Sequence, residues 1–395
     1  MFATWPVPTF PLMSGRQSML LDAIAGLKAT GVGLVGLRGQ RLFAAGFDDD
    51  PGFYYFVPQL ARVLDISPNA STWLFFGGML GLAVLVGSIG WSFYARDLRS
   101  RILGIAGILL VACLSLAIGD MYVLLAALVL TGVPPLLALW RRNPSNSRWI
   151  AVLVPVGIVV GIGASARSEA GFPVLVFASV LLLARNTDRL SRRFIRLFTL
   201  LAAIATPVLA VRAVQAHRDA YLAREVADYV KPKRTHPFWH PVYLGFGYLS
   251  NEHVTAYLDE VAMARVAAIA PGTPNFSPEY EAVLRREVLN LIVSSPLLVV
   301  RTIAAKFGVL CLYLAVFANI GLVASWRYRK PPVLELAFAA ALAIASVPAI
   351  LTIPNTSYLE GFIALSVLYA AVSCEWVLGM QRRREGPTRL EPTPT

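Results

Sequence analysis

Long apolar runs alternate along the chain with short polar connections that are mostly basic. A run of roughly 20 apolar residues can cross about 30 Å of hydrocarbon as a helix, because each residue adds about 1.5 Å. The pattern therefore predicts about ten membrane-spanning helices, although Asp22 and Lys28 interrupt the first run. We place these spans at 19–37, 72–95, 102–119, 121–140, 149–165, 171–184, 194–214, 303–326, 332–353 and 357–379.

The composition supports a membrane protein. Of the 395 residues, 57% are hydrophobic and only 15% are charged, which leaves too little polar surface for a soluble domain. The net charge of +12 does not indicate a nucleic-acid partner, because the arginines gather between apolar runs, as they do in cytoplasmic loops. All three cysteines lie inside apolar runs, so neither a disulfide framework nor a thiolate metal site is expected.

The distribution of basic residues predicts the topology. If the N-terminus is cytoplasmic, every loop on that side is basic, as the positive-inside rule requires. We therefore expect a multi-pass protein of the cytoplasmic (inner) membrane with both termini in the cytoplasm. The inside segments are then 96–101, 141–148, 185–193, 327–330 and the tail from 382. The outward loops are 38–71, 119–120, 166–170, 215–302 and 354–356.

The expected fold class is all-α, a polytopic transmembrane helical bundle with an α-rich extracytoplasmic loop subdomain. Within the large loop, apolar residues at helical spacing predict helices at 252–268 and 278–293, the second opened by Ser277 as N-cap. The tail contains three prolines in its last ten residues and should be disordered. We divide the chain into an N-terminal bundle (1–214), the loop subdomain (215–302), C-terminal transmembrane helices (303–380) and a cytoplasmic tail (381–395).

Polar residues that need an explanation collect on the outward side. Charged groups at the centre of a bilayer cost on the order of 2.5 to 3.5 kcal/mol each on insertion scales, so a group of them at one face indicates a site. We expect a cleft at the outer membrane surface. The residues concerned are Asp48, Asp49, Asp50, Asp120, Arg167, Glu169, the four histidines (His217, His236, His240 and His253), Tyr358 and Glu360.

The first outward loop carries an acidic run at 48–50, followed by an aromatic amphipathic segment at 53–66, and Asp120 occupies the second outward loop. This arrangement, over the whole chain, resembles the GT-C superfamily of membrane glycosyltransferases, which includes the protein mannosyltransferases and the aminoarabinose transferases. In that superfamily an acidic residue or pair in the first outward loop precedes a helix along the membrane surface. A second acid commonly lies in the second outward loop.

The resemblance implies a polyprenyl-phosphate-linked sugar donor and a glycan, lipid or protein acceptor, in contact with membrane lipid and without nucleic acid. A carboxylate would take the proton from the acceptor, and the candidates are Asp48, Asp49 and Asp120. Structural roles stay open for these acids. Asp48 and Asp49 could be solvated loop charges, and Asp120 could cap a helix that starts at Met121. Asp50 before Pro51 is typical of a helix N-cap.

Cations would stabilise the departing phosphate, and the candidates for binding it are Arg167, Arg301 and Lys306. Arg301 and Lys306 follow Pro296 at the outer end of a span, where long side chains reach the headgroup level. Both could instead snorkel to bulk lipid phosphates. Arg167 could instead form an ion pair with Glu169 that ties two helices together.

The fourth outward loop contains a string of aromatic residues and histidines between Thr235 and Tyr248. Such side chains suit a sugar ring, although the aromatic residues could instead seat the loop at the membrane interface. Histidines four apart could ligate zinc on a helix, but Pro237 and Pro241 interrupt it; we predict no metal site, while a divalent metal cofactor stays open. The candidates for sugar or acceptor binding are His236, Trp239, Tyr243, Tyr358 and Glu360, and His240 is a candidate base or orienting donor.

The leading hypothesis is an integral membrane glycosyltransferase of the GT-C type. One alternative is a transporter or flippase of lipid-linked glycans, which should carry its polar groups at the bilayer midplane. Another is an O-antigen-ligase-like enzyme, which also has a large outward loop with histidine and arginine. Phosphate-cradling glycine motifs and a serine nucleophile elbow are absent from the sequence, which argues against an ATP-driven pump or a serine hydrolase.

Overall fold

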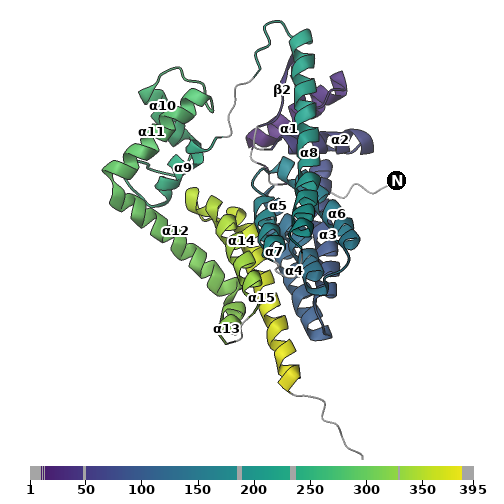
Figure 1. Cartoon of the computed structure of the whole chain (residues 1–395). Coiled ribbons are helices and arrows are strands. Elements are labelled where there is room, and N and C mark those ends of the chain that lie inside the picture. The colour runs from purple at the N-terminus through teal and green to yellow at the C-terminus, as the bar shows by residue number, and fades with distance from the viewer. Residues whose placement is uncertain are drawn as a thin grey trace, which may run out of the picture.

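A computed structural model of the chain describes residues 10, 12, 14–47, 50–184, 189–231, 237–327 and 330–384. These residues form helices almost throughout, with one two-stranded hairpin, so the all-α class is confirmed. Among them, eight helices are long and apolar enough to cross a membrane, fewer than the ten predicted. They are α3 (Pro68–Tyr94), α4 (Leu98–Ile118), α5 (Val123–Arg142), α6 (Asn146–Ala166), α8 (Leu190–Glu225), α12 (Pro296–Phe317), α14 (Pro332–Leu351) and α15 (Thr356–Arg384) (Figure 1).

The predicted first span, 19–37, is wrong. Helix α1 (Ser14–Thr30) ends before Gly31, which has a φ of +73°, and the chain then forms the hairpin of β1 (Val35–Arg38) and β2 (Arg41–Ala44). The helix packs so closely on the hairpin that a Cβ at Gly26 would lie 2.0 Å from the Val35 carbonyl oxygen. The apolar residues of this run are therefore shared between a helix and a strand, which cover each other instead of facing lipid.

Two other predicted spans differ in shape. The run at 171–184 forms α7 (Phe172–Leu183), whose 12 residues extend about 18 Å, too short to cross the hydrocarbon unaided. A helix this short is tolerated at membrane depth where protein covers it, and α7 packs against α5, α8 and α14 with Phe177 fully buried. The run at 303–326 is divided at Ala318 into α12 and α13 (Asn319–Arg327).

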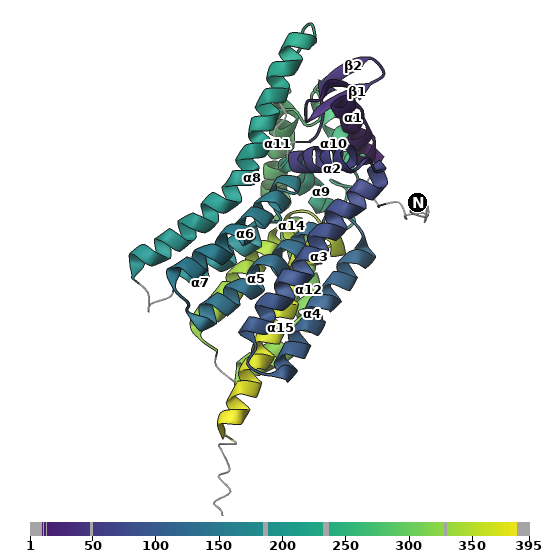
Figure 2. The same ribbon diagram turned by 90° about the vertical axis from the view of Figure 1, so that its right-hand side faces the viewer.

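The two ends of the bundle carry different structures (Figures 1 and 2). One end, here called the loop end, holds α1, the hairpin, α2 (Pro51–Leu64) and the large loop. Helix α15 finishes at the opposite end, here called the basic end, where Arg141 and Arg142 close α5 and Arg327 closes α13. Since α1 does not cross and lies at the loop end, the expectation that both ends of the chain share one side has no support.

Helix α8 is much longer than the predicted span 194–214. Its 36 residues extend about 54 Å, beyond the roughly 30 Å of a hydrocarbon core. The C-terminal part of α8 extends beyond this length and lies beside the hairpin (Figure 2). There an Arg218 guanidinium nitrogen donates a 3.4 Å hydrogen bond to the Ala45 carbonyl. The long helix therefore helps to hold the N-terminal segment over the bundle.

Helix α5 forms the centre of the bundle, because 94% of the residues in its most apolar 18-residue segment are buried inside the protein. Its partner α3 approaches through glycines: a Cβ at Gly90 would lie 2.6 Å from the Pro135 backbone nitrogen. Small residues at such contacts let helix backbones meet in a membrane, where water does not drive association. The turn that precedes α5 is thereby placed at the middle of the loop end.

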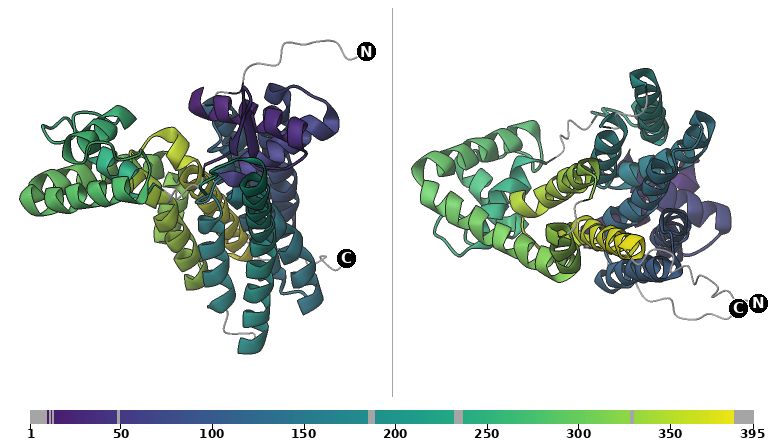
Figure 3. Two further views of the ribbon diagram at one scale, coloured as in Figure 1. Left: turned by 90° about the horizontal axis from the view of Figure 1, so that it is seen from above. Right: turned by 60° about the horizontal axis from the view of Figure 1, so that its bottom comes forward.

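The large loop forms a helical subdomain that projects to one side of the bundle (Figure 3). It contains α9 (Trp239–Gly245), η1 (Phe246–Tyr248), α10 (Asp259–Ile269) and α11 (Pro278–Ser294), which share an apolar core. The predicted helix at 278–293 is confirmed, and Ser277 caps it by accepting from the Tyr280 amide. The predicted helix at 252–268 begins only at Asp259, because Asn251 accepts from the amides of 253 and 254 and holds a turn there.

Candidate functional site

The turn between α4 and α5 presents Asp120. Gly119 ends α4 in the left-handed conformation, with a φ of +60°, and Asp120 follows it directly. The Asp120 carboxylate accepts a hydrogen bond of 2.5 Å from the Met121 amide. Helix α5 starts only at Val123 with Tyr122 in the N-cap position, so Asp120 precedes the helix rather than capping it.

Arg167 at the end of α6 reaches across to the same turn. Its guanidinium donates a 2.9 Å hydrogen bond to the Tyr122 hydroxyl and lies 4.5 Å from the centroid of that ring. It also forms an ion pair of 2.5 Å with Glu169. The ion pair that the sequence left open is therefore present, but it lies within the connection between α6 and α7. The hydrogen bond from Arg167 to Tyr122 ties that connection to the start of α5.

Arg16 and Asp50 form a second ion pair beside this turn. Asp50 occupies the N-cap position of α2, as predicted, but its side chain makes no capping hydrogen bond and is fully buried against Arg16 of α1. The first turn of α2 is pressed onto the end of α6, since a Cβ at Gly52 would lie 2.4 Å from the Ser165 hydroxyl. Asp48 and Asp49, which precede Asp50 in the chain, lie outside the described residues.

The first turns of α15 complete the group. The Tyr358 ring meets the Tyr122 ring edge to face, with centroids 4.8 Å apart. Glu360, two residues further, is 2% exposed. The Ser115 hydroxyl lies near its carboxylate, but among the described residues neither carboxylate oxygen has a hydrogen bond of good geometry. A buried carboxylate without partners is costly, so its retention needs a reason other than packing.

We call Arg16, Asp50, Asp120, Arg167, Glu169 and Glu360 the acid–arginine cluster. Its members influence one another electrostatically. Burial raises the pKa of the Asp120 carboxyl, while the Met121 amide and the charges of Arg16 and Arg167 lower it in part. Glu360 in turn lies close enough to Asp120 to feel its charge. The cluster is therefore an enclosed set of acids whose charge two guanidinium groups only partly balance.

Lys306 lies where the loop subdomain meets the bundle. Its side chain is 3% exposed, and its ammonium donates a 3.0 Å hydrogen bond to the Ile350 carbonyl in the last turn of α14. A Cβ at Gly245 would lie 3.0 Å from that ammonium. A cation at a helix C-terminus is favourable, so Lys306 has a structural role there and does not snorkel to lipid. Arg301 is exposed on α12 and does not join the cluster.

His240 belongs to a different group inside the loop subdomain. Its Nδ1 lies 2.7 Å from the Tyr280 hydroxyl and its Nε2 lies 3.1 Å from an Asp259 carboxylate oxygen. The hydrogen bond with His240 holds the pKa of Asp259 below its usual value. Glu281 accepts from the amides of Trp239 and His240, which fixes the start of α9. We call His240, Asp259, Tyr280 and Glu281 the His240 cluster.

The other loop candidates are separated from one another. Tyr243 is buried in the core of the loop subdomain, while Trp239 is partly exposed under the guanidinium of Arg285 at 6.0 Å. His236 lies outside the described residues. Among the residues that the structure describes, no group of three or more histidine, cysteine, aspartate or glutamate side chains is arranged to hold a metal ion.

The structure thus brings together four residues that the sequence predicted: Asp120, Arg167, Tyr358 and Glu360. Sequence reasoning missed Arg16, a lone cation ahead of the first apolar run. It also missed Tyr257, whose hydroxyl lies 3.4 Å from that of Tyr358 and links the loop subdomain to the cluster. Nothing in the sequence distinguishes Tyr257 from the other aromatic residues of the loop.

The fold and the cluster define a helical membrane-spanning protein with buried ionic groups at one end of its bundle. Comparisons with protein-family models, with curated proteins and with solved structures found no match to this chain. Its function is therefore argued from the chemistry of the cluster.

Proposed function

We propose that this protein is a glycosyltransferase of the GT-C type, which moves a sugar from a polyprenyl-phosphate donor to an acceptor at the extracytoplasmic face. The acid–arginine cluster carries the proposal. Two arginines and four acids at the buried end of an apolar bundle cost free energy, and the Glu360 carboxylate has only the nearby Ser115 hydroxyl and no hydrogen bond of good geometry among the described residues. Ionisable groups kept in such a place are by default functional.

In this reaction the carboxylates and the arginines of the site have different roles. The acceptor hydroxyl or amine forms a bond to the anomeric carbon, the bond from that carbon to the phosphate oxygen breaks, and polyprenyl phosphate leaves as an anion. A carboxylate takes the acceptor proton, a role we give to Asp48 or Asp49 with Asp120 beside the acceptor. Arg16 and Arg167 stabilise the developing phosphate charge. His240 has no part here, because both of its ring nitrogens are engaged within the loop subdomain.

The orientation follows from the distribution of basic residues. The arginines at the ends of α5 and α13 and at the start of α8 lie at the basic end, which the positive-inside rule assigns to the cytoplasm. The loop end and the cluster then face outward from the cytoplasmic membrane. In intact cells, an impermeant thiol reagent should label an Asn275→Cys variant and leave a Ser147→Cys variant unlabelled; the reverse pattern would contradict the proposal.

The depth of the cluster favours an enzyme over a transporter of lipid-linked glycans. Transporters bind substrate near the bilayer midplane, often at unwound segments of spanning helices. Here Asp120 and Arg167 lie in connections at one end of the bundle, and α5 runs unbroken from that end. A donor phosphate held at headgroup level would meet these groups without crossing the membrane.

The test uses purified protein in nanodiscs with a panel of radiolabelled polyprenyl-phosphate hexoses and pentoses. We expect the wild-type protein to consume one of these donors, and Asp48→Asn or Asp49→Asn to slow consumption by about 10² to 10⁴, the usual contribution of a catalytic base. Asp65→Asn is the matched control, because Asp65 is exposed on the same segment and asparagine tolerates its φ of +49°. Normal turnover in both the Asp48 and the Asp49 variant would contradict the assigned base.

A further inference from the structure

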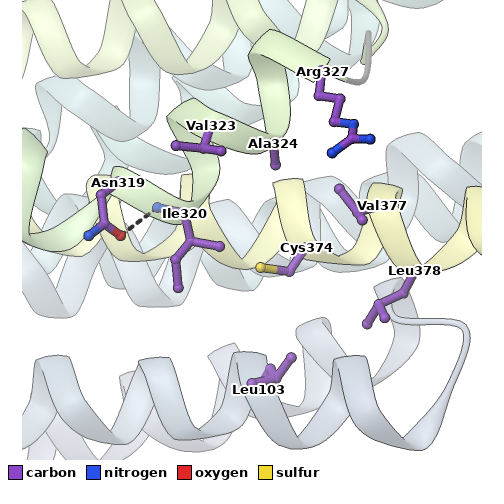
Figure 4. Close-up of a pocket in the computed structure, with 9 residues that line it drawn as sticks. All are labelled: Leu103, Asn319, Ile320, Val323, Ala324, Arg327, Cys374, Val377 and Leu378. Carbon is purple, nitrogen blue, oxygen red and sulfur yellow. Dashed lines mark hydrogen bonds between the residues drawn. The ribbon is translucent and has the colours of Figure 1, made fainter.

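An apolar groove of about 590 Å³ opens at the basic end, on the opposite end of the bundle from the acid–arginine cluster. Helix α15 forms its floor with Cys374 and Val377, α13 forms one wall with Ile320 and Val323, and Leu103 of α4 forms the other (Figure 4). The wall residues are open to the surroundings, Ile320 at 62% and Val323 at 71% exposed. The groove therefore faces the membrane and not the protein core.

The break between α12 and α13 shapes this groove. Ala318 is fully buried where the two helices meet, and α13 then contacts α15 so closely that a Cβ at Gly321 would lie 2.8 Å from the Ala370 Cα. Asn319 and Arg327, at the two ends of α13, both line the groove, so it follows the whole helix. The nine residues of α13 extend about 13.5 Å, close to the depth of one leaflet of a roughly 30 Å hydrocarbon core.

The polar groups of the groove lie at its ends. The Asn319 carboxamide is used locally, since it accepts from the Ile320 amide as the dashed line in Figure 4 shows. Arg327, by contrast, is exposed and has no ion-pair partner among the described residues. The preceding Trp326 is 95% exposed, a position typical of tryptophan at the membrane interface. The groove thus combines a one-leaflet apolar channel with a cation at headgroup level.

We propose that this groove binds one acyl chain of an anionic phospholipid, with the lipid phosphate at Arg327. In a phospholipid, an apolar chain leads to an anionic phosphate. In the groove, the apolar lining leads to the Arg327 cation, so the two match along their length. Basic sites between transmembrane helices on the cytoplasmic side recognise anionic lipid headgroups in this way. The site is separate from the proposed donor site at the loop end, so it stands whether or not the protein transfers sugars.

Cys374 on the floor of the groove serves as the reporter, and Cys113, exposed on α4, serves as an internal control. In a Cys311→Ser background, the rates at which a small maleimide modifies the two thiols are measured in detergent with added phosphatidylglycerol, phosphatidylcholine or polyprenyl phosphate. We expect phosphatidylglycerol to slow modification of Cys374 several-fold and to leave Cys113 unchanged. Arg327→Gln should weaken this protection about fivefold, the effect of one basic residue near an anionic surface.

The matched control is Arg192→Gln, which removes an exposed arginine at the start of α8, outside the groove. It should protect as the wild-type protein does, and mass spectrometry should find one retained phosphatidylglycerol in both. Three results with the added lipids would overturn the proposal. They are equal protection of both cysteines, equal protection by phosphatidylcholine, and protection by polyprenyl phosphate alone, which would make the groove part of donor binding. Loss of protection in Arg192→Gln would also overturn it, because general charge would then explain the effect.

Discussion

The acid–arginine cluster and the His240 cluster both lie at the loop end, but they differ in how many of their buried polar atoms have hydrogen-bond partners. In the His240 cluster, both ring nitrogens of His240 and both carboxylate oxygens of Glu281 have partners within the loop subdomain. In the acid–arginine cluster, Glu360 is also buried, and among the described residues neither of its oxygens has a hydrogen bond of good geometry, although the Ser115 hydroxyl lies near them. The first cluster is a closed structural unit, and the second retains unused binding capacity.

This difference changes which residues are the better candidates for a catalytic role. A histidine in a loop on the outward side is a natural catalytic candidate from sequence, but a ring whose two nitrogens are engaged cannot take a proton from a substrate without breaking its own contacts. Buried polar groups without partners are rare, and each calls for an explanation. The Tyr257 and Tyr358 hydroxyls, 3.4 Å apart, give the loop subdomain a contact with α15 beside Tyr122, which Arg167 contacts.

Within the acid–arginine cluster, the largest expected effect is on transfer in Asp120→Asn. We expect transfer to fall by about 10², less than in the variant that removes the base, because Asp120 beside the acceptor supports the base and an amide lacks the negative charge to do so, while stability changes little. Burial raises the pKa of Asp120, so the carboxylate is lost as pH falls through that raised value, and the wild-type rate should decline there. The measurement is the pH profile of sugar transfer, with thermal unfolding of each variant as control. An unchanged acidic limb in Asp120→Asn would assign that limb to another group.

A smaller effect is expected from breaking the ion pair between Arg16 and Asp50. Removing one partner leaves the other buried and unpaired, so Asp50→Asn or Arg16→Gln should each lower the free energy of unfolding by about 3 kcal/mol. The double variant should lose less than the sum of the two, because neither charge is then left alone. Denaturant unfolding in detergent measures the cycle. Additive losses would mean that the two side chains do not depend on each other.

The smallest effect, and the most direct comparison of the clusters, comes from two matched glutamine substitutions. Glu281→Gln should lower the free energy of unfolding by about 1 to 3 kcal/mol, because its carboxylate accepts from the amides of Trp239 and His240 and an amide nitrogen cannot. Glu360→Gln should be neutral or stabilising, since it replaces a buried carboxyl that has no hydrogen bond of good geometry among the described residues. Thermal unfolding of the two variants checks this order. Equal losses would show that Glu360 is as well satisfied as Glu281.

Much of the architecture could be predicted from the sequence. Eight of the ten predicted runs correspond to helices long and apolar enough to span, although the bounds at 194–214 and 303–326 differ, because the length of a span depends on the bilayer thickness and the helical rise. The aromatic segment predicted at 53–66 is α2, opened by Pro51, and α11 starts at Pro278 after Ser277. These are local properties, decided within a few residues of chain. The concentration of polar groups at one end was predictable for the same reason.

The failures involve residues whose state depends on distant neighbours. The run at 19–37 is apolar enough for a span, but Gly26 lets α1 pack on Val35, and Asp22 pairs with Arg38 of the same hairpin. Asp50 occupies the predicted N-cap position, but its side chain makes no capping hydrogen bond and instead pairs with Arg16, 34 residues earlier in the chain. Lys306, which could have snorkelled to bulk lipid phosphates, is buried and donates to the Ile350 carbonyl at the end of α14. No local pattern contains these partners.

The sequence by itself determined which segments, with the exception of 19–37 and 171–184, are long and apolar enough to span, and that many polar residues gather at one end of the bundle, because a hydrophobic run positions its own flanking residues. The tertiary structure alone decided which of those groups meet. Asp120 and Arg167 come from two separate connections and Glu360 from the start of α15, and they converge because α5 occupies the centre of the bundle. That central position depends on close helix contacts such as Gly90 against Pro135, whose geometry no one-dimensional hydrophobic pattern records.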